Sequence, residues 1–174
     1  MGSAYINSDG TTHKINYNGN SRIKYSEYLS GLLGIRYNGY FNDDLNWFLT
    51  ATPHGDTNTL SQIDNFSSSI DYSSEEFYSW EWNGYFKANS SEIYTFYTSS
   101  DDASYLWINN ILVVNNGGLH GNTEQSGTIN LAADTYYPIK IQFGENSGGD
   151  ILTVSFSTDT IAKTTNGSGY YFHS

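Results

Sequence analysis

Apolar and polar residues alternate along much of the chain with a period of two. Between residues 136 and 144, the sequence YYPIKIQFG places Tyr137, Ile139, Ile141 and Phe143 on one face. This alternation is typical of a β-strand that buries one of its faces. Three further segments are predicted to be strands: SWEWNGYFKA (79–88), SEIYTFYTSS (91–100) and DILTVSFS (150–157).

Turn-forming residues separate these strands. The segment YLWINNILVV, residues 105–114, predicts a hairpin, because Asn109 and Asn110 tolerate the positive φ angles of a tight turn. Two segments rich in Gly and Asn follow, NNGGLHGN at 115–122 and GENSGGD at 144–150. Short strands separated by such turns predict an all-β fold, specifically an antiparallel β-sandwich with long loops.

Two regions show a weaker pattern. Residues 43–76 have little periodicity and predict a long loop with a short helical turn near residues 60–63. Residues 1–30 are polar and alternate only weakly, which predicts an N-terminal extension that can add an edge strand. A length of 174 residues suits one domain covering residues 1–174, and we expect this domain to be monomeric in isolation.

The charge balance narrows the possible partners. The chain has 18 Asp and Glu against 7 Lys and Arg, a formal net charge of −11, which argues against nucleic acid and anionic membranes as partners. No apolar run is long enough to insert into a membrane. Few charges (14%) with abundant Asn, Ser, Gly and Tyr are common in extracellular or virion-surface β modules. The absence of Cys excludes thiol catalysis.

Two adjacent aspartates, Asp101 and Asp102, stand directly before a strand-like run in SSDDASYLWINN. Three interpretations are open: a turn, a solvated loop tip, or a cation site in which a metal ion offsets the repulsion between the carboxylates. Two carboxylates are too few for calcium, which takes six to eight oxygens, and GENSGGD is the candidate second loop. Its glycines also suit a simple hairpin. A second pair, Asp43-Asp44, lacks the strand context and predicts a solvated turn.

Three characteristic segments follow one another along the chain: GLLGIRYNGYF (31–41), SWEWNGYFKANSSEIYTFYTSSDDASYLWINNILVVNN (79–116) and IQFGENSGGDILTVSF (141–156). Together they resemble the PA14 domain family. The most specific is SDDASYLWI (100–108), in which Ala103 stands where the family usually has Gly. The resemblance covers roughly residues 31–172 and implies a β-sandwich.

In sugar-binding members of that family, two adjacent aspartates joined by a cis peptide hold a calcium ion, which binds two vicinal hydroxyls of a sugar. The resemblance therefore implies Ca²⁺ ligation by Asp101 and Asp102. From the second loop it implies a side-chain oxygen of Asn146 and the carbonyls of Gly148 and Asp150. Glu145 competes for the side-chain role, because the register of this loop is ambiguous by one residue.

Side chains around the ion would select the sugar. Asn116, Gly117 and His120 are candidate ligand-binding neighbours, together with Asp101, Asp102 and Glu145, although a lone histidine such as His120 is more often structural. Residues 47–54 can supply a rim. Trp80, Trp82 and Trp107 alternate with apolar neighbours and are predicted to lie in the core.

The leading hypothesis is a calcium-dependent carbohydrate-binding module that binds glycans with vicinal hydroxyls, as part of a larger extracellular or cell-surface adhesin. The alternative is a structural or protein-binding domain in which calcium only fixes loops. An enzyme is not expected, because adjacent aspartates on one cation both stay ionised and cannot provide a general acid. The common hydrolase and phosphate-loop motifs are also missing from the sequence.

Overall fold

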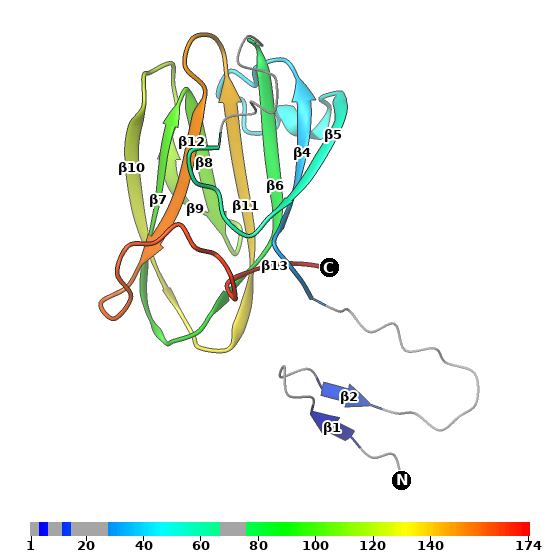
Figure 1. Ribbon diagram of the computed structural model, residues 1–174, viewed down its shortest axis with the longest axis vertical. Coiled ribbons are helices and arrows are strands. Elements are labelled where there is room, and N and C mark those ends of the chain that lie inside the picture. The colour runs from blue at the N-terminus through cyan, green and yellow to red at the C-terminus, as the bar shows by residue number, and fades with distance from the viewer. Residues whose placement is uncertain (1–3, 7–11, 15–27, 67–75) are drawn as a thin grey trace, which may run out of the picture.

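The computed structural model describes the backbone of residues 4–6 and 12–14 and all atoms of residues 28–66 and 76–174. Its regular structure is almost entirely antiparallel β-strand (Figure 1). In the described part of the chain, no helix is long and apolar enough to cross a membrane. The strands are β1 (Ala4–Ile6), β2 (Thr12–Lys14), β3 (Leu29–Ser30), β4 (Leu32–Asn38), β5 (Pro53–Leu60), β6 (Tyr78–Ala88), β7 (Glu92–Asp101), β8 (Ala103–Ile108), β9 (Ile111–Asn116), β10 (Thr123–Leu131), β11 (Thr135–Glu145), β12 (Ile151–Ser157) and β13 (Tyr171–His173).

Two sheets form the predicted β-sandwich. The larger has the strand order β3-β13-β6-β11-β8-β9, with β4 added beside β6 and β5 beside β4. The smaller has the order β10-β7-β12. Strands β1 and β2 pair with each other in a separate two-stranded sheet. The predicted hairpin is confirmed as β8 and β9, and Asn109 and Asn110 in its turn have positive φ angles of 51° and 62°.

The core lies between the two sheets. The larger sheet contributes Trp82, Phe86 and Ile141, and the smaller contributes Phe96 and Phe156, all fully buried. Each of these side chains comes from the apolar face of a strand that the alternating pattern predicts. Aromatic rings meet edge to face in this core, as Phe86 does with Phe96 and with Phe156.

A second apolar cluster lies on the outer face of the larger sheet. Phe41 and Phe48 pack there against Ala103 and Tyr105 of β8. Phe48 belongs to a single 3₁₀ turn, η1 (Trp47–Leu49). The loop that follows β4 therefore covers one end of this face.

Residues 43–76 differ in part from the prediction. They contain β5, which pairs with β4. The hydrophobic pattern does not predict this strand, because an exposed edge strand such as PHGDTNTL needs no apolar alternation. The predicted helical turn near residues 60–63 is wrong: Leu60 ends β5, and the helical turn lies at η1. Within residues 1–30, Leu29–Ser30 forms the short edge strand β3 beside β13.

The predicted burial of the tryptophans is correct for Trp80 and Trp82, which are 5% and 0% exposed. It is wrong for Trp107, which is half-buried on the outer face of the larger sheet. The cause is the strand period: Leu106 and Ile108 point inward, so Trp107 between them must point outward.

Candidate metal and ligand site

Three connections cross between the two sheets at the same end of the sandwich. They join β7 to β8, β9 to β10, and β11 to β12. The strand register brings them together, because Asp101 lies opposite Ile151 at the start of β12, and Ala103 lies opposite Gly144 at the end of β11. The loop between β11 and β12 is at the top of Figure 1. Residues far apart in the sequence thus surround Asp101 and Asp102.

Asp102 holds two of these connections through hydrogen bonds. Its Oδ1 accepts the main-chain N–H of His120 at 3.0 Å, and its Oδ2 accepts that of Asn146 at 3.0 Å. The residue is only 5% exposed. Each carboxylate oxygen has a second lone pair, so these bonds leave Asp102 able to bind a cation as well.

Asp101 is joined to Asp102 by a cis peptide bond. Its side chain meets the β11–β12 loop closely: a Cβ added to Gly149 would lie 2.9 Å from Asp101 Oδ2. Burial, and next the negative charge of Asp102, raise the pKa of Asp101. Because of the close approach of the loop, a side chain at position 149 would crowd the Asp101 carboxylate.

Glu145, the last residue of β11, completes an acidic cluster. It is 1% exposed, and neither of its carboxylate oxygens has a hydrogen-bond partner among the described residues. Burial, followed by the charges of Asp102 and Asp101, raises the pKa of Glu145 to about 8. A buried carboxyl group without a partner is costly, and a cation beside it would remove that cost.

The geometry of this cluster fits calcium. Asp101, Asp102 and Glu145 each offer an oxygen, and the three atoms lie within 4.8 Å of one another. Calcium ligands lie about 2.3–2.6 Å from the ion, so oxygens on opposite sides of one ion are about 4.6–5.2 Å apart. The three oxygens can therefore share one calcium ion, and a site of carboxylate oxygens alone suits a hard cation such as calcium better than zinc or copper.

The β11–β12 loop is held by residues that the sequence analysis did not identify. Glu76 Oε2 accepts the N–H of Gly148 at 2.9 Å, and the hydroxyl of Tyr78 donates to Asp150 Oδ2 at 2.7 Å. Gly148 has a φ of 110°, a conformation that favours glycine. Ligation by Asn146, Gly148 and Asp150 stays a prediction, although all three lie in the loop that reaches the acidic cluster.

The loop between β9 and β10 contains the three predicted neighbours of the ion. Asn116 is 3% exposed, and its side-chain amide donates to Ser100 Oγ and to the carbonyl of Thr123. This buried amide therefore stabilises the β9–β10 loop. The ring of His120 lies within hydrogen-bond distance of the carbonyls of Gly121 and Asn116. These contacts support the structural interpretation of His120. Ligand binding by Asn116, Gly117 and His120 stays a prediction.

Comparison with known families decides what kind of domain this is. The model of the PA14 domain matches residues 29–169. The chain belongs to the PA14 domain family. The family-model match thus confirms the resemblance that the SDDASYLWI motif carries.

Several proteins are similar to this PA14 domain. Anti-sigma-I factor RsgI3 of Acetivibrio thermocellus is 38% identical over 66 residues, which are 38% of this chain and 10% of that protein. An anti-sigma factor domain-containing protein from Clostridium clariflavum has a TM-score of 0.68 at 26% identity, over 84% of this chain and 48% of that one. The chain therefore spans less than half the length of these relatives.

Epithelial adhesin 6 A domain from Candida glabrata, solved in complex with Galβ1-3GlcNAc, has a TM-score of 0.70 at 16% identity. The match covers 87% of this chain and 90% of that domain. At this identity the likeness shows the fold alone.

Asp43 is a residue of this PA14 domain whose contacts the sequence did not reveal. It lies in an exposed turn, as predicted, but its Oδ1 accepts the hydroxyl of Tyr105 at 2.9 Å and the N–H of Gly118 at 3.1 Å. The loop also passes so close to Tyr105 that a Cβ on Gly117 would meet the ring hydroxyl. Asp43 thus ties the turn after β4 to the β9–β10 loop.

Proposed function

We propose that this chain is a calcium-dependent carbohydrate-binding module. The observation that carries the proposal is the buried carboxyl group of Glu145, which lies beside Asp101 and Asp102 and has no hydrogen-bond partner among the described residues. In this proposal those three side chains, with loop oxygens of Asn146, Gly148 and Asp150, hold the ion. A bound calcium ion would supply open coordination positions for two vicinal hydroxyls of a sugar.

The surrounding loops would select among sugars. The β9–β10 loop, with Gly117 and His120, lies beside Asp102 and is held by Asn116 from within. A sugar placed on the ion would meet this loop first. Few hydroxyls can reach one ion, so each site would bind weakly, and several copies on a larger surface protein would be needed for avidity.

With this function, we propose that the domain acts outside the cell or on its surface. Support comes from the likeness in fold to an epithelial adhesin domain solved with a disaccharide. The module would have no catalytic role of its own, because carboxylates that share one cation all stay ionised and none can act as a general acid.

Calorimetric titration of simple sugars tests the proposal. Galactose, mannose, glucose and Galβ1-3GlcNAc are titrated into the protein with calcium, and again with EDTA. We expect at least one sugar to bind with calcium and none to bind at this site with EDTA. Asp101→Ala should abolish calcium and sugar binding together. Calcium binding with no response across a broad glycan panel would contradict the proposal.

A second function is favoured by the contacts of Asp102. Its two oxygens already hold the β9–β10 and β11–β12 loops through main-chain N–H groups. Calcium would then serve to fix these loops as a surface for a protein partner. In that case calcium would change hydrogen exchange in both loops, while no sugar would alter it further. Additional protection on adding a sugar would favour the carbohydrate-binding function.

A further inference from the structure

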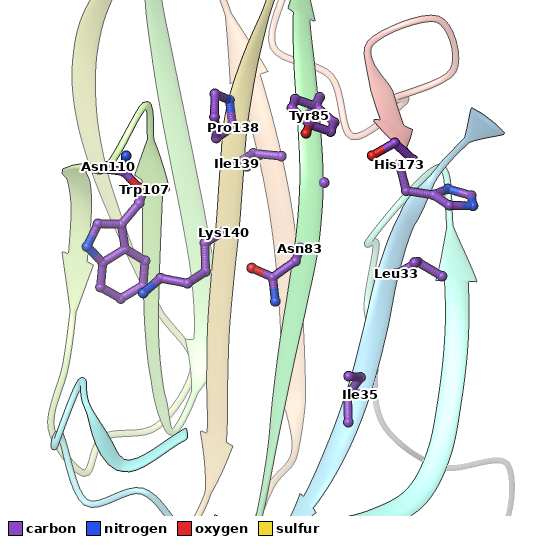
Figure 2. Close-up of a pocket in the computed structure, with 12 residues that line it drawn as sticks. Leu33, Ile35, Asn83, Tyr85, Trp107, Asn110, Pro138, Ile139, Lys140 and His173 are labelled. Carbon is purple, nitrogen blue, oxygen red and sulfur yellow. The ribbon is translucent and has the colours of Figure 1, made fainter. Parts of the chain in front are cut away.

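An open groove runs across the outer face of the larger sheet, away from the acidic cluster. We call it the outer-face groove. It has a volume of about 580 Å³, within the range of small-ligand sites. Figure 2 shows Leu33, Asn83, Lys140 and Trp107 projecting into it from β4, β6, β11 and β8.

These four residues form one row across the sheet. Leu33 is paired with Asn83, Asn83 with Lys140, and Lys140 with Trp107. Neighbouring strands lie about 4.8 Å apart, so the row is about 14 Å long. Lys140 and Glu145 are both on β11, five residues apart, which is about 17 Å along an extended strand. The groove is therefore separate from the acidic cluster.

Lys140 is the unusual residue in this groove. The structure describes four Lys and Arg side chains, of which Arg36, Lys87 and Lys163 form ion pairs with carboxylates. Among the described residues, Lys140 has no carboxylate within ion-pair distance. Its Nζ instead lies 4.1 Å from the ring centroid of Trp107. A cation–π contact orients the ammonium group without neutralising its charge.

The same face of the sheet also carries an acidic residue. Glu81, one row further along β6, accepts hydrogen bonds from Gln142 at 2.7 Å and Asn83 at 2.8 Å. Both donors are neutral amides, so Glu81 keeps its negative charge, but its carboxylate does not come within ion-pair distance of Lys140. In a chain of net charge −11, the groove presents a positive charge beside an indole ring, with no ion-pair partner in the described part of the chain.

We propose that the outer-face groove binds an acidic glycan, with Lys140 pairing with the carboxylate of a uronic acid. The exposed apolar surface of Leu33 and the half-buried Trp107 would contact the C–H surfaces of the sugar rings. The exposed amide of Asn83, between them, can bond a hydroxyl.

The groove suits a glycan better than an acidic peptide. Peptides that bind β-proteins commonly add a strand to a free sheet edge, where main-chain groups supply the affinity. The outer-face groove lies over four adjacent strands, whose main-chain groups are paired with one another. The groove therefore offers a ligand only side chains: an apolar, a polar, a cationic and an aromatic one in a row.

The test uses two probes with the same sugar backbone. Tetragalacturonic acid and its fully methyl-esterified form are titrated into the whole chain in EDTA, which keeps calcium out of the acidic cluster. We expect the acid to bind and the ester to bind at least fivefold more weakly. Because calcium is absent, failure of the calcium-dependent function would not affect this result.

Variants locate the binding. Lys140→Gln should weaken binding of the acid at least fivefold and leave binding of the ester unchanged. Lys163→Gln is the matched control, since Lys163 also lies over an aromatic ring, Tyr97, at 4.1 Å, but pairs with Glu124. Circular dichroism should show that both variants fold. Equal binding of acid and ester, equal loss in both variants, tighter binding of a tetra-aspartate peptide, or no binding of the acid would each overturn the proposal.

Discussion

Glu145 is the residue whose ionisation is most altered by the fold. Burial raises its pKa from 4.5 to about 8, so the folded, calcium-free protein binds an extra proton between these values. The contribution of the Glu145 carboxyl group to the free energy of unfolding is therefore fully present below about pH 4.5 and is lost as the pH rises toward 8. Above that range the buried carboxylate is ionised and has no partner among the described residues.

We expect Glu145→Gln to remove this pH dependence. In EDTA at pH 8, the variant should be more stable than the wild type toward urea, because an uncompensated charge has gone. With calcium the order should reverse, since the variant loses a ligand. Urea unfolding at pH 5 and pH 8 measures both effects. Asp159→Asn, in an exposed position beyond the far end of β12, is the control and should leave the order unchanged.

Asp43 provides a second prediction at this scale. Asp43→Ala removes the acceptor of Tyr105 and Gly118, and we expect a loss of about 1–2 kcal/mol in the free energy of unfolding. Sugar binding should weaken more than calcium binding, because the β9–β10 loop becomes less ordered while the acidic side chains stay. Asp43→Asn keeps an oxygen acceptor at this position and should behave nearly as the wild type in the same calorimetric titrations.

The sequence predicts some residues of the site and not others. Asp101 and Asp102 stand in a specific motif, and GENSGGD is adjacent to a strand, so both segments could be found. The register within that loop could not, because Glu145 and Asn146 carry equally suitable oxygens. Asp43 acts through a contact 75 residues away in the chain, and no local pattern encodes such a contact.

At the scale of elements, the site depends on connections that change sheets at one end of the sandwich. The β11–β12 loop must pass close to Asp101, and Gly149 allows this approach. We expect Gly149→Ala to weaken calcium binding at least tenfold while the fold is kept, because its Cβ would crowd the carboxylate.

Gly121→Ala is the matched control for this prediction. Its Cβ would lie 4.0 Å from the same oxygen, which is an ordinary contact. Calcium titration by calorimetry compares the two variants. Equal affinities in Gly149→Ala and the wild type would show that the ion does not lie beside Asp101.

Most strands could be predicted from the sequence, because a strand with one buried face alternates apolar and polar residues. The segments at 79–88 and 136–144 lie within β6 and β11, and those at 91–100 and 150–157 each begin one residue before β7 and β12. Strand β5 has no fully buried face, and its first three residues, Pro53, His54 and Gly55, are exposed. Its pairing with β4 comes from tertiary context, which a local pattern does not contain.

For the whole molecule, two surfaces have opposite electrostatic character. One end of the sandwich gathers Asp101, Asp102 and Glu145, and the outer-face groove presents Lys140 without a carboxylate partner among the described residues. The two can act on one extended glycan or on different ones. The predictions of one domain over residues 1–174, monomeric in isolation, stay predictions. Parts of the predicted N-terminal extension and of the predicted loop at 43–76 lie outside the described part of the chain, namely residues 1–3, 7–11, 15–27 and 67–75.

The most direct test of the central claim is a crystal structure of the protein grown with calcium and its tightest-binding sugar. The account predicts one ion with oxygens of Asp101, Asp102 and Glu145 about 2.3–2.6 Å away, and two vicinal sugar hydroxyls on the same ion. Anomalous scattering from the ion would fix its position. An ion enclosed by protein oxygens alone, with the sugar elsewhere, or no ion between these carboxylates, would contradict it.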